Sequence, residues 1–78
     1  MPKSLRTPRQ EALQQLLVRT RKSKNLTQVD VARRLGRPQS FVAKYEGGER
    51  RLDIIEFIEV ARALEADPHG LLAVLLRK

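Results

Sequence analysis

The residues best suited to recognising another molecule lie in a short predicted helix, from Gln39 to Glu46. At helical spacing, one face of this segment presents the side chains of Gln39, Ser40, Ala43 and Lys44. A glutamine can form two hydrogen bonds with adenine, a lysine can donate to guanine, and a serine can take either role. This face therefore suits the major groove of DNA. The pattern also fits an amphipathic helix whose polar face meets only solvent, and helix composition alone leaves both interpretations open.

A second short helix and a tight turn are predicted directly before this segment. Thr27 and Asp30 have the spacing of a capping box, in which a hydroxyl and a carboxylate satisfy backbone donors at a helix start. Gly36 suits the left-handed position that ends a helix. Pro38, which cannot supply a side-chain cap, stands at the start of the next helix, and Gly47-Gly48 ends it. Two short helices joined in this way are typical of a helix-turn-helix.

The distribution of charge favours a polyanionic partner. The chain carries a formal charge of +7 and has a pI near 10.9. Residues 1–26 carry +6, residues 27–52 carry +3, and residues 53–78 carry −2. The positive charge therefore gathers around the predicted helix-turn-helix, as in proteins that bind nucleic acid. Aromatic residues are scarce, which argues against the binding of single strands by base stacking.

Several other classes of function lack the residues that they need. The sequence has no cysteine and one histidine, His69, so it offers neither a disulfide framework nor a zinc-finger site. It contains no nucleophile–base pair, and the carboxylates of Glu56 and Glu59 are expected to be surface charges with ordinary pKa values. No apolar run reaches the length of a membrane span. We therefore predict no enzymatic activity, no metal or other cofactor, no membrane association, and a cytoplasmic location.

The remaining helices can be placed from their start signals. Thr7 followed by Pro8 marks the first helix, and Asp67 followed by Pro68 marks the last. Asp53 marks the fourth, because Glu56 follows it at capping-box spacing. The fourth helix is expected to face inward through Ile54, Phe57, Ile58, Ala61 and Leu64, with Ile55 and Val60 outside this stripe.

The run LTQVDVARRLGRPQSFVAKYEGGERR resembles the Cro-type helix-turn-helix repressors of phages and bacteria, the Xre-like family. The resemblance extends from about Leu13 to Leu72. Its most specific parts are Thr27-Gln28, the Ala32…Gly36 pair and Tyr45-Glu46-Gly47-Gly48-Glu49-Arg50. It implies an all-α fold, a compact five-helix bundle of the phage-repressor type. Residues 1–6 would form a flexible basic N-terminal arm, and residues 7–78 a helix-turn-helix DNA-binding domain with a C-terminal dimerisation helix.

The resemblance also implies roles for particular residues. In this family an arginine at the position of Arg21 pairs with the glutamate at the position of Glu46, holds the first helix against the reading helix, and lies near a phosphate. The glutamine at the position of Gln28 grips a phosphate and braces the first residue of the reading helix. A helix N-terminus presents free N–H groups, which independently supports this phosphate contact. The family's base-reading positions are those of Gln39, Ser40 and Lys44.

Two positions depart from the family pattern or stay ambiguous. Glu49 stands where the family often has a lysine facing phosphate, and Arg50 and Arg51 are expected to take over that contact. Phe41 either completes the core beside Tyr45 or touches thymine methyls, a contact that the major groove permits.

The last predicted helix is apolar on nearly every side, through Leu71, Leu72, Val74, Leu75 and Leu76. A domain of 78 residues cannot bury all of these side chains against itself. The sequence therefore predicts a homodimer with these five residues at its interface. Together with the resemblance, this implies a bacterial or phage-encoded regulator of transcription, a repressor, that binds double-stranded DNA sequence-specifically at an operator with two-fold symmetry. The alternative is an antitoxin-like interaction module that binds a partner protein, a toxin, through the same helix.

Overall fold

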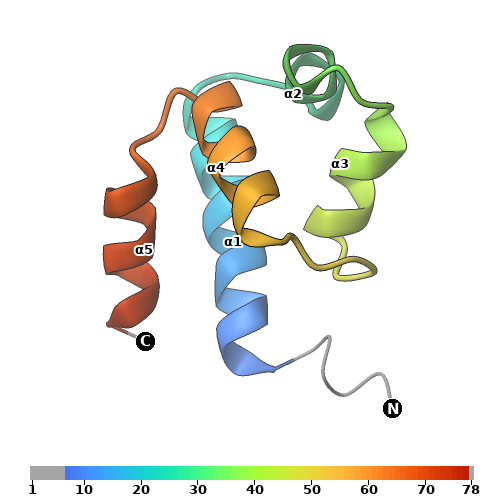
Figure 1. The fold of residues 1–78 in the computed structure, drawn as a ribbon. Coiled ribbons are helices and arrows are strands. Elements are labelled where there is room, and N and C mark those ends of the chain that lie inside the picture. The colour runs from blue at the N-terminus through green and yellow to red at the C-terminus, as the bar shows by residue number, and fades with distance from the viewer. Residues whose placement is uncertain (1–6, 78) are drawn as a thin grey trace.

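A computed structural model of the protein describes residues 7–77 and consists of five α-helices in that range (Figure 1). Their bounds are α1 Pro8–Ser23, α2 Gln28–Leu35, α3 Gln39–Glu46, α4 Ile54–Ala63 and α5 Pro68–Leu76. The predicted all-α, five-helix fold is thereby confirmed. The predicted N-terminal arm, residues 1–6, lies outside the described residues.

The helix starts follow the caps that the sequence marks. Thr7 accepts a hydrogen bond from the Gln10 backbone N–H, and Asp67 accepts one from that of His69. Complete capping boxes open α2 and α4, and each satisfies two backbone donors. Only α3, among these five helices, starts without a side-chain cap, because its N-cap residue is Pro38. The start of α3 must therefore be held by tertiary contacts.

Two glycines shape the chain around α3. Gly36 ends α2 in the left-handed conformation at φ 67° and turns the chain sharply into α3. Gly48 follows α3 at φ 82°. Residues with a Cβ adopt these angles only with strain, so both positions favour glycine. The turn that directs α3 away from α2 is thus encoded locally.

The helices pack around a core to which each of them contributes. Fully buried side chains come from α1, α2, α3 and α4 and from the residue after α4: Leu17, Val31, Val42, Val60 and Leu64. In Figure 1, α3 and α5 lie on opposite sides of the molecule, with α1 and α4 between them. α3 packs against α2 and α1, whereas α5 packs against α1 and α4. This arrangement leaves one long side of α3 at the surface.

The inward face of α4 differs from the predicted stripe. Val60, expected outside the stripe, is fully buried, and Ile54, expected inside it, is exposed. The buried face runs through Phe57, Val60, Ala61 and Leu64. Ile54 is the first residue of the helix, and it lies where the chain has not yet reached the core. Phe57, Ala61 and Leu64 are thus buried as predicted and Ile58 is partly buried, whereas the predictions for Ile54 and Val60 are wrong.

Glu56 is buried and paired, so the prediction of a surface charge with an ordinary pKa is wrong. Its two carboxylate oxygens accept hydrogen bonds from the Arg50 guanidinium at 2.8 and 2.7 Å. It also accepts the capping-box bond from the Asp53 backbone N–H at 3.0 Å. These hydrogen bonds, the one from Arg50 first, lower the pKa of Glu56 to about 2. Glu59, on the same helix, is exposed as expected.

Replacing Glu56 with glutamine should lower the free energy of unfolding and make that free energy depend less on pH. The pKa of Glu56 lies near 2 in the folded protein, against 4.5 as its ordinary value. The ion pair therefore stabilises the fold above about pH 4.5, and this contribution is lost as the pH falls through about 2. We expect Glu56→Gln to destabilise the protein by about 1 to 2 kcal/mol at neutral pH, because Arg50 is partly exposed to solvent.

Urea unfolding at several pH values, followed by circular dichroism, measures this difference. Glu59→Gln is the matched control, since it removes an exposed carboxylate from the same helix and leaves the Arg50–Glu56 pair in place. A difference between Glu56→Gln and wild type that stayed constant down to pH 2 would contradict the assignment.

Candidate nucleic-acid interface

The outer face of α3 carries the three predicted base-reading residues. Gln39, Ser40 and Lys44 are exposed. On the opposite side, Val42 and Tyr45 are buried in the core. The structure therefore brings an amide, a hydroxyl and an amine together on one accessible strip of helix. These are groups that can hydrogen-bond to the edges of DNA bases.

A buried ion pair connects α1 to the end of α3. The Arg21 guanidinium donates to the Glu46 carboxylate through Nε at 2.8 Å and through Nη2 at 3.1 Å. The two side chains are only 11% and 6% exposed. Arg21 Nη1 also donates to the backbone carbonyl of Leu26, in the loop before α2. This is the pair that the resemblance implies, and it anchors three segments at one guanidinium.

Gln28 extends this ion pair to the start of α3. Its Nε2 donates to Glu46 Oε1 at 2.9 Å, and its Oε1 accepts a hydrogen bond from Gln39 Nε2 at 2.7 Å. A continuous hydrogen-bonded network thus runs from Arg21 through Glu46 and Gln28 to Gln39. The Gln39 amide keeps its own oxygen and one N–H for another partner. One acceptor and one donor are the groups that a two-bond contact with adenine requires.

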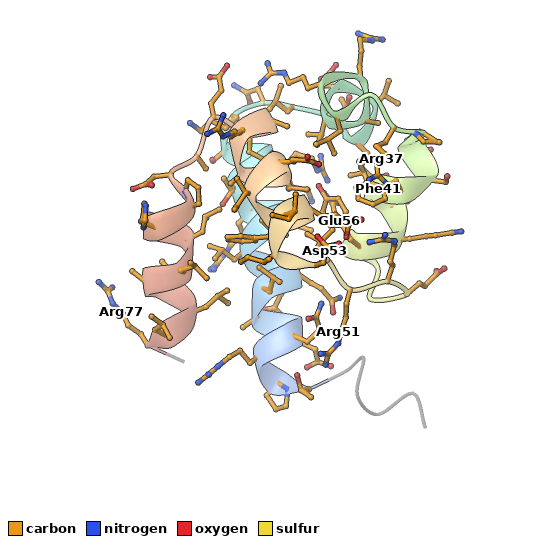
Figure 2. All side chains as sticks on the ribbon, viewed as in Figure 1. Arg37, Phe41, Arg51, Asp53, Glu56 and Arg77 are labelled. Atoms are coloured by element: carbon orange, nitrogen blue, oxygen red, sulfur yellow. The ribbon has the colours of Figure 1, made fainter. Side chains whose placement is uncertain are left out.

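Phe41 belongs to the core, which decides between its two predicted roles. The ring is buried and packs edge-to-face against Tyr45, with the centroids 5.5 Å apart. Two guanidinium groups lie over the same ring, Arg37 at 4.5 Å from the centroid and Arg50 at 4.9 Å. Figure 2 shows Arg37 and Phe41 together beside α3, with Glu56 close by. Cations over an aromatic face are attracted by the ring quadrupole.

Neither the role of Arg37 nor the burial of Glu56 was predicted from the sequence. Helical spacing gave no signal for Arg37, because this residue lies in the turn before α3 and not on the helix that carries Phe41. No signal indicated the burial of Glu56 either. Its partner Arg50 lies in the loop before α4, and only the path of that loop brings the two together. The two residues are only six positions apart, but their pairing depends on the conformation of the connecting loop and not on a helical or strand spacing.

The two arginines after α3 differ in how they are engaged. Arg50 donates to Glu56 and to the Arg51 backbone carbonyl, so its guanidinium is already ordered. Hydrogen bonding to Glu56 is the main cause that raises the pKa of Arg50. The side chain of Arg51 is exposed, and within residues 7–77 no hydrogen bond or ion pair engages it. The phosphate contacts of Arg50 and Arg51 remain predictions. Of the two, Arg51 could bind a phosphate without breaking a hydrogen bond of its own side chain.

The predicted dimer residues of α5 divide into two groups. Leu71 and Leu75 are buried in the protomer's own core, and Val74 packs partly against it. Leu72 and Leu76 are exposed, Leu76 to 74%. We use the name α4–α5 surface for the exposed large apolar residues of these two helices, which are Ile54, Ile55, Leu72 and Leu76. Ile54 and Leu72 also line one apolar hollow, together with Phe57, Ile58, Arg62, Pro68 and His69.

None of the helices between residues 7 and 77 combines the length and apolarity needed to cross a bilayer. The same part of the chain holds no group of three or more His, Cys, Asp or Glu side chains placed to bind a metal ion.

The buried ion pair yields a test of stability. Replacing Arg21 with methionine should destabilise the fold by about 3 kcal/mol, because Glu46 is left buried without its cation. The double variant Arg21→Met/Glu46→Leu should recover part of this loss, since no charge then stays unpaired. Chemical denaturation of the wild type, both single variants and the double variant gives the coupling energy. Additive effects of the two substitutions would contradict a direct pair.

The comparisons with known proteins agree with this architecture. A family model described as Helix-turn-helix (HTH_3) matches residues 17–71. No curated protein sequence matches the chain. Among solved structures, an XRE-family like protein from Pseudomonas syringae pv. tomato str. DC3000 is 49% identical, with 88% of this chain and 84% of that chain covered and a TM-score of 0.86.

Two restriction-modification controller proteins are also similar in structure. C.AhdI from Aeromonas hydrophila is 30% identical, with 76% of this chain and 89% of that chain covered and a TM-score of 0.70. Wild-type C.Esp1396I is 18% identical, with coverages of 92% and 95% and a TM-score of 0.84, and this likeness concerns the fold alone. The family model spans most of the chain, including both helices of the helix-turn-helix. The chain therefore belongs to the Xre-like family of helix-turn-helix DNA-binding transcription regulators.

Proposed function

We propose that the protein is a homodimeric repressor that recognises a duplex operator of two-fold character by its sequence. The observation that carries this proposal is the exposed polar face of α3, with Gln39, Ser40 and Lys44 side by side on it. The helix behind this face is fixed at both ends by the network from Arg21 to Gln39. A rigid helix with a polar, accessible face is what reading base edges in a major groove requires.

The proposed contacts divide into two kinds. Gln39, Ser40 and Lys44 would discriminate between bases, whereas cations and helix starts around α3 would bind phosphates. Gln28 stands at the start of α2, where free N–H groups favour an anion. Arg21, Gln28, Arg50 and Arg51 are the proposed phosphate contacts. Of these, Arg21 and Arg50 are already paired with the carboxylates of Glu46 and Glu56, which fix the orientation of their guanidinium groups.

The α4–α5 surface is the proposed dimer interface. Leu72 and Leu76 are available to a partner, together with Ile54 and Ile55, whereas Leu71 and Leu75 serve the protomer's own core. α5 lies on the side of the molecule away from α3, so pairing there leaves both reading helices accessible (Figure 1). In a dimer of this kind, two reading helices face successive major grooves about 34 Å apart.

One protein with the same fold binds an operator as an assembly. C.Esp1396I forms a tetramer in complex with its natural 35 base-pair operator. By analogy, our protein would occupy promoter DNA in the bacterial cytoplasm and block transcription without any chemical step. The α4–α5 surface would equally suit a toxin bound by an antitoxin-like module. We favour self-association because a two-fold operator calls for two copies of the reading helix.

Substitutions in the two proposed classes of contact should have different signatures. Lys44→Ala should relax the preference at one base position, at a cost of about 1 to 3 kcal/mol for the preferred base. Arg51→Ala should weaken binding to all duplexes alike and reduce the slope of log K against log salt by about 1 per protomer.

Selection of bound sequences from random duplex DNA, at stated salt, measures the first effect, and titration at several salt concentrations measures the second. The two variants serve as controls for each other. If both lowered affinity uniformly and left the selected sequence unchanged, the proposed division between base and phosphate contacts would be wrong. A wild-type protein that preferred no duplex would refute the proposed function itself.

A charge placed on the α4–α5 surface should disrupt the dimer. Leu76→Asp replaces the most exposed leucine of α5 with a carboxylate, and this carboxylate would lose its hydration in the interface. We expect self-association to weaken by at least about tenfold, which corresponds to about 1.4 kcal/mol. Val29→Asp is the control, because Val29 is an exposed apolar residue on α2, outside this surface. Sedimentation equilibrium without DNA compares the three proteins, and a wild type that stays monomeric would favour the antitoxin-like alternative.

A further inference from the structure

Arg37 occupies a distinctive place, in the turn between α2 and α3. It lies between Gly36, which ends α2, and Pro38, the N-cap of α3. Its side chain is 42% exposed, yet its guanidinium is stacked over the Phe41 ring at 4.5 Å. A planar guanidinium stacked on a ring keeps its N–H donors at its edge, free to bind elsewhere. Arg37 is therefore ordered at the surface without its hydrogen-bonding capacity being used.

The carboxylate nearest to Arg37 does not use those donors either. Arg37 Nη2 lies 3.7 Å from Glu56 Oε2, an ion-pair distance with no hydrogen bond within residues 7–77. The Glu56 oxygens instead accept from Arg50 at 2.8 and 2.7 Å and from the Asp53 backbone N–H. Glu56 thus attracts Arg37 by charge alone. A partly exposed ion pair of this kind contributes little and is easily exchanged for a stronger anion.

We propose that Arg37 binds a DNA backbone phosphate beside the start of the reading helix. Phe41 acts as the platform that holds the guanidinium, and Glu56 acts as a weak internal counter-anion that the phosphate replaces. Guanidinium and phosphate match in geometry and can form two parallel hydrogen bonds. This inference rests on the proposed function, in which α3 enters a major groove, and it adds a contact that neither the sequence nor the family resemblance indicated.

The position of Arg37 favours a phosphate over a base. Arg37 precedes α3 and stacks on its buried residue Phe41, beside Glu56 (Figure 2). The reading face, by contrast, is formed by the exposed residues Ser40 and Lys44 on the helix itself. A cation at the flank of a helix inserted into a groove faces the wall of that groove, which is sugar and phosphate. Arg50 stays with Glu56 in this exchange, because its two short hydrogen bonds would otherwise be lost.

The test compares Arg37→Gln, Arg37→Lys and the control Arg77→Gln with the wild type. Arg77 is an exposed arginine at the end of α5, on the other side of the molecule from Arg37 (Figure 2). Arg77→Gln removes the same charge far from α3. Binding of each protein to the selected operator and to an unrelated duplex is measured by fluorescence anisotropy over a range of salt concentrations. Sedimentation and thermal unfolding verify that each variant is folded and in the same oligomeric state.

We expect Arg37→Gln to weaken binding to both duplexes by the same factor, roughly eightfold per protomer at 0.1 M salt. The slope of log K against log salt should fall by about 0.9 per protomer. Arg37→Lys should keep the slope but recover only part of the affinity, because an ammonium lacks the planar fork. Arg77→Gln should match the wild type in both quantities.

Three results would overturn the inference while the wild type still selects an operator. Arg37→Gln with unchanged affinity and slope would show that Arg37 does not contact DNA. A loss confined to the operator would show that Arg37 reads a base. An equal loss in Arg77→Gln would show a general effect of net charge. Failure of the wild type to prefer any duplex would instead refute the proposed function, and this inference with it.

Discussion

The reading helix of this protein depends on one buried ion pair, between Arg21 of α1 and Glu46 at the end of α3. Two charges with so little exposure stabilise a fold only when their remaining hydrogen bonds are satisfied. Here Leu26 accepts from the guanidinium and Gln28 donates to the carboxylate. The pair therefore does more than join two helices. It determines where Gln28 points and, through Gln28, how Gln39 is presented at the surface.

A second polar cluster supports α3 from its other flank. Arg50 is held by Glu56 of α4, and together with Arg37 it covers the ring of Phe41. α3 is only eight residues long and starts without a side-chain cap, so its own hydrogen bonds provide little independent stability. The two clusters supply the stability that the helix alone lacks. The Arg21–Glu46 cluster holds the end of α3, and the cluster around Phe41 holds its side. Both leave the polar face of α3 exposed.

Local signals in the sequence predicted most of the fold. The caps at Thr7, Thr27 and Asp53 and the left-handed Gly36 are short-range features, and they placed the helices correctly. Two residues of α4, Ile54 and Val60, were placed on the wrong side, because the packing of the other helices decides how much of α4 is covered. The burial of Glu56 was also missed, because the path of the loop that carries Arg50 determines it. The surplus of leucines in α5 was recognised, but only the packing shows which of them serve the core. The exposed face of α3 was predicted because helical spacing alone determines it.

The hydrogen bond between Gln28 and Gln39 limits how binding preference can diverge among descendants of this protein. Ser40 and Lys44 are exposed, and no hydrogen bond or ion pair within residues 7–77 engages their side chains. A change at either position therefore disturbs no other residue of the fold. Gln39 is different, because its replacement leaves the amide oxygen of Gln28 without the hydrogen bond that Gln39 donates. Substitutions of Ser40 and Lys44 are thus the most direct way to change the preferred operator sequence. Residues 28 and 39 are expected to change together.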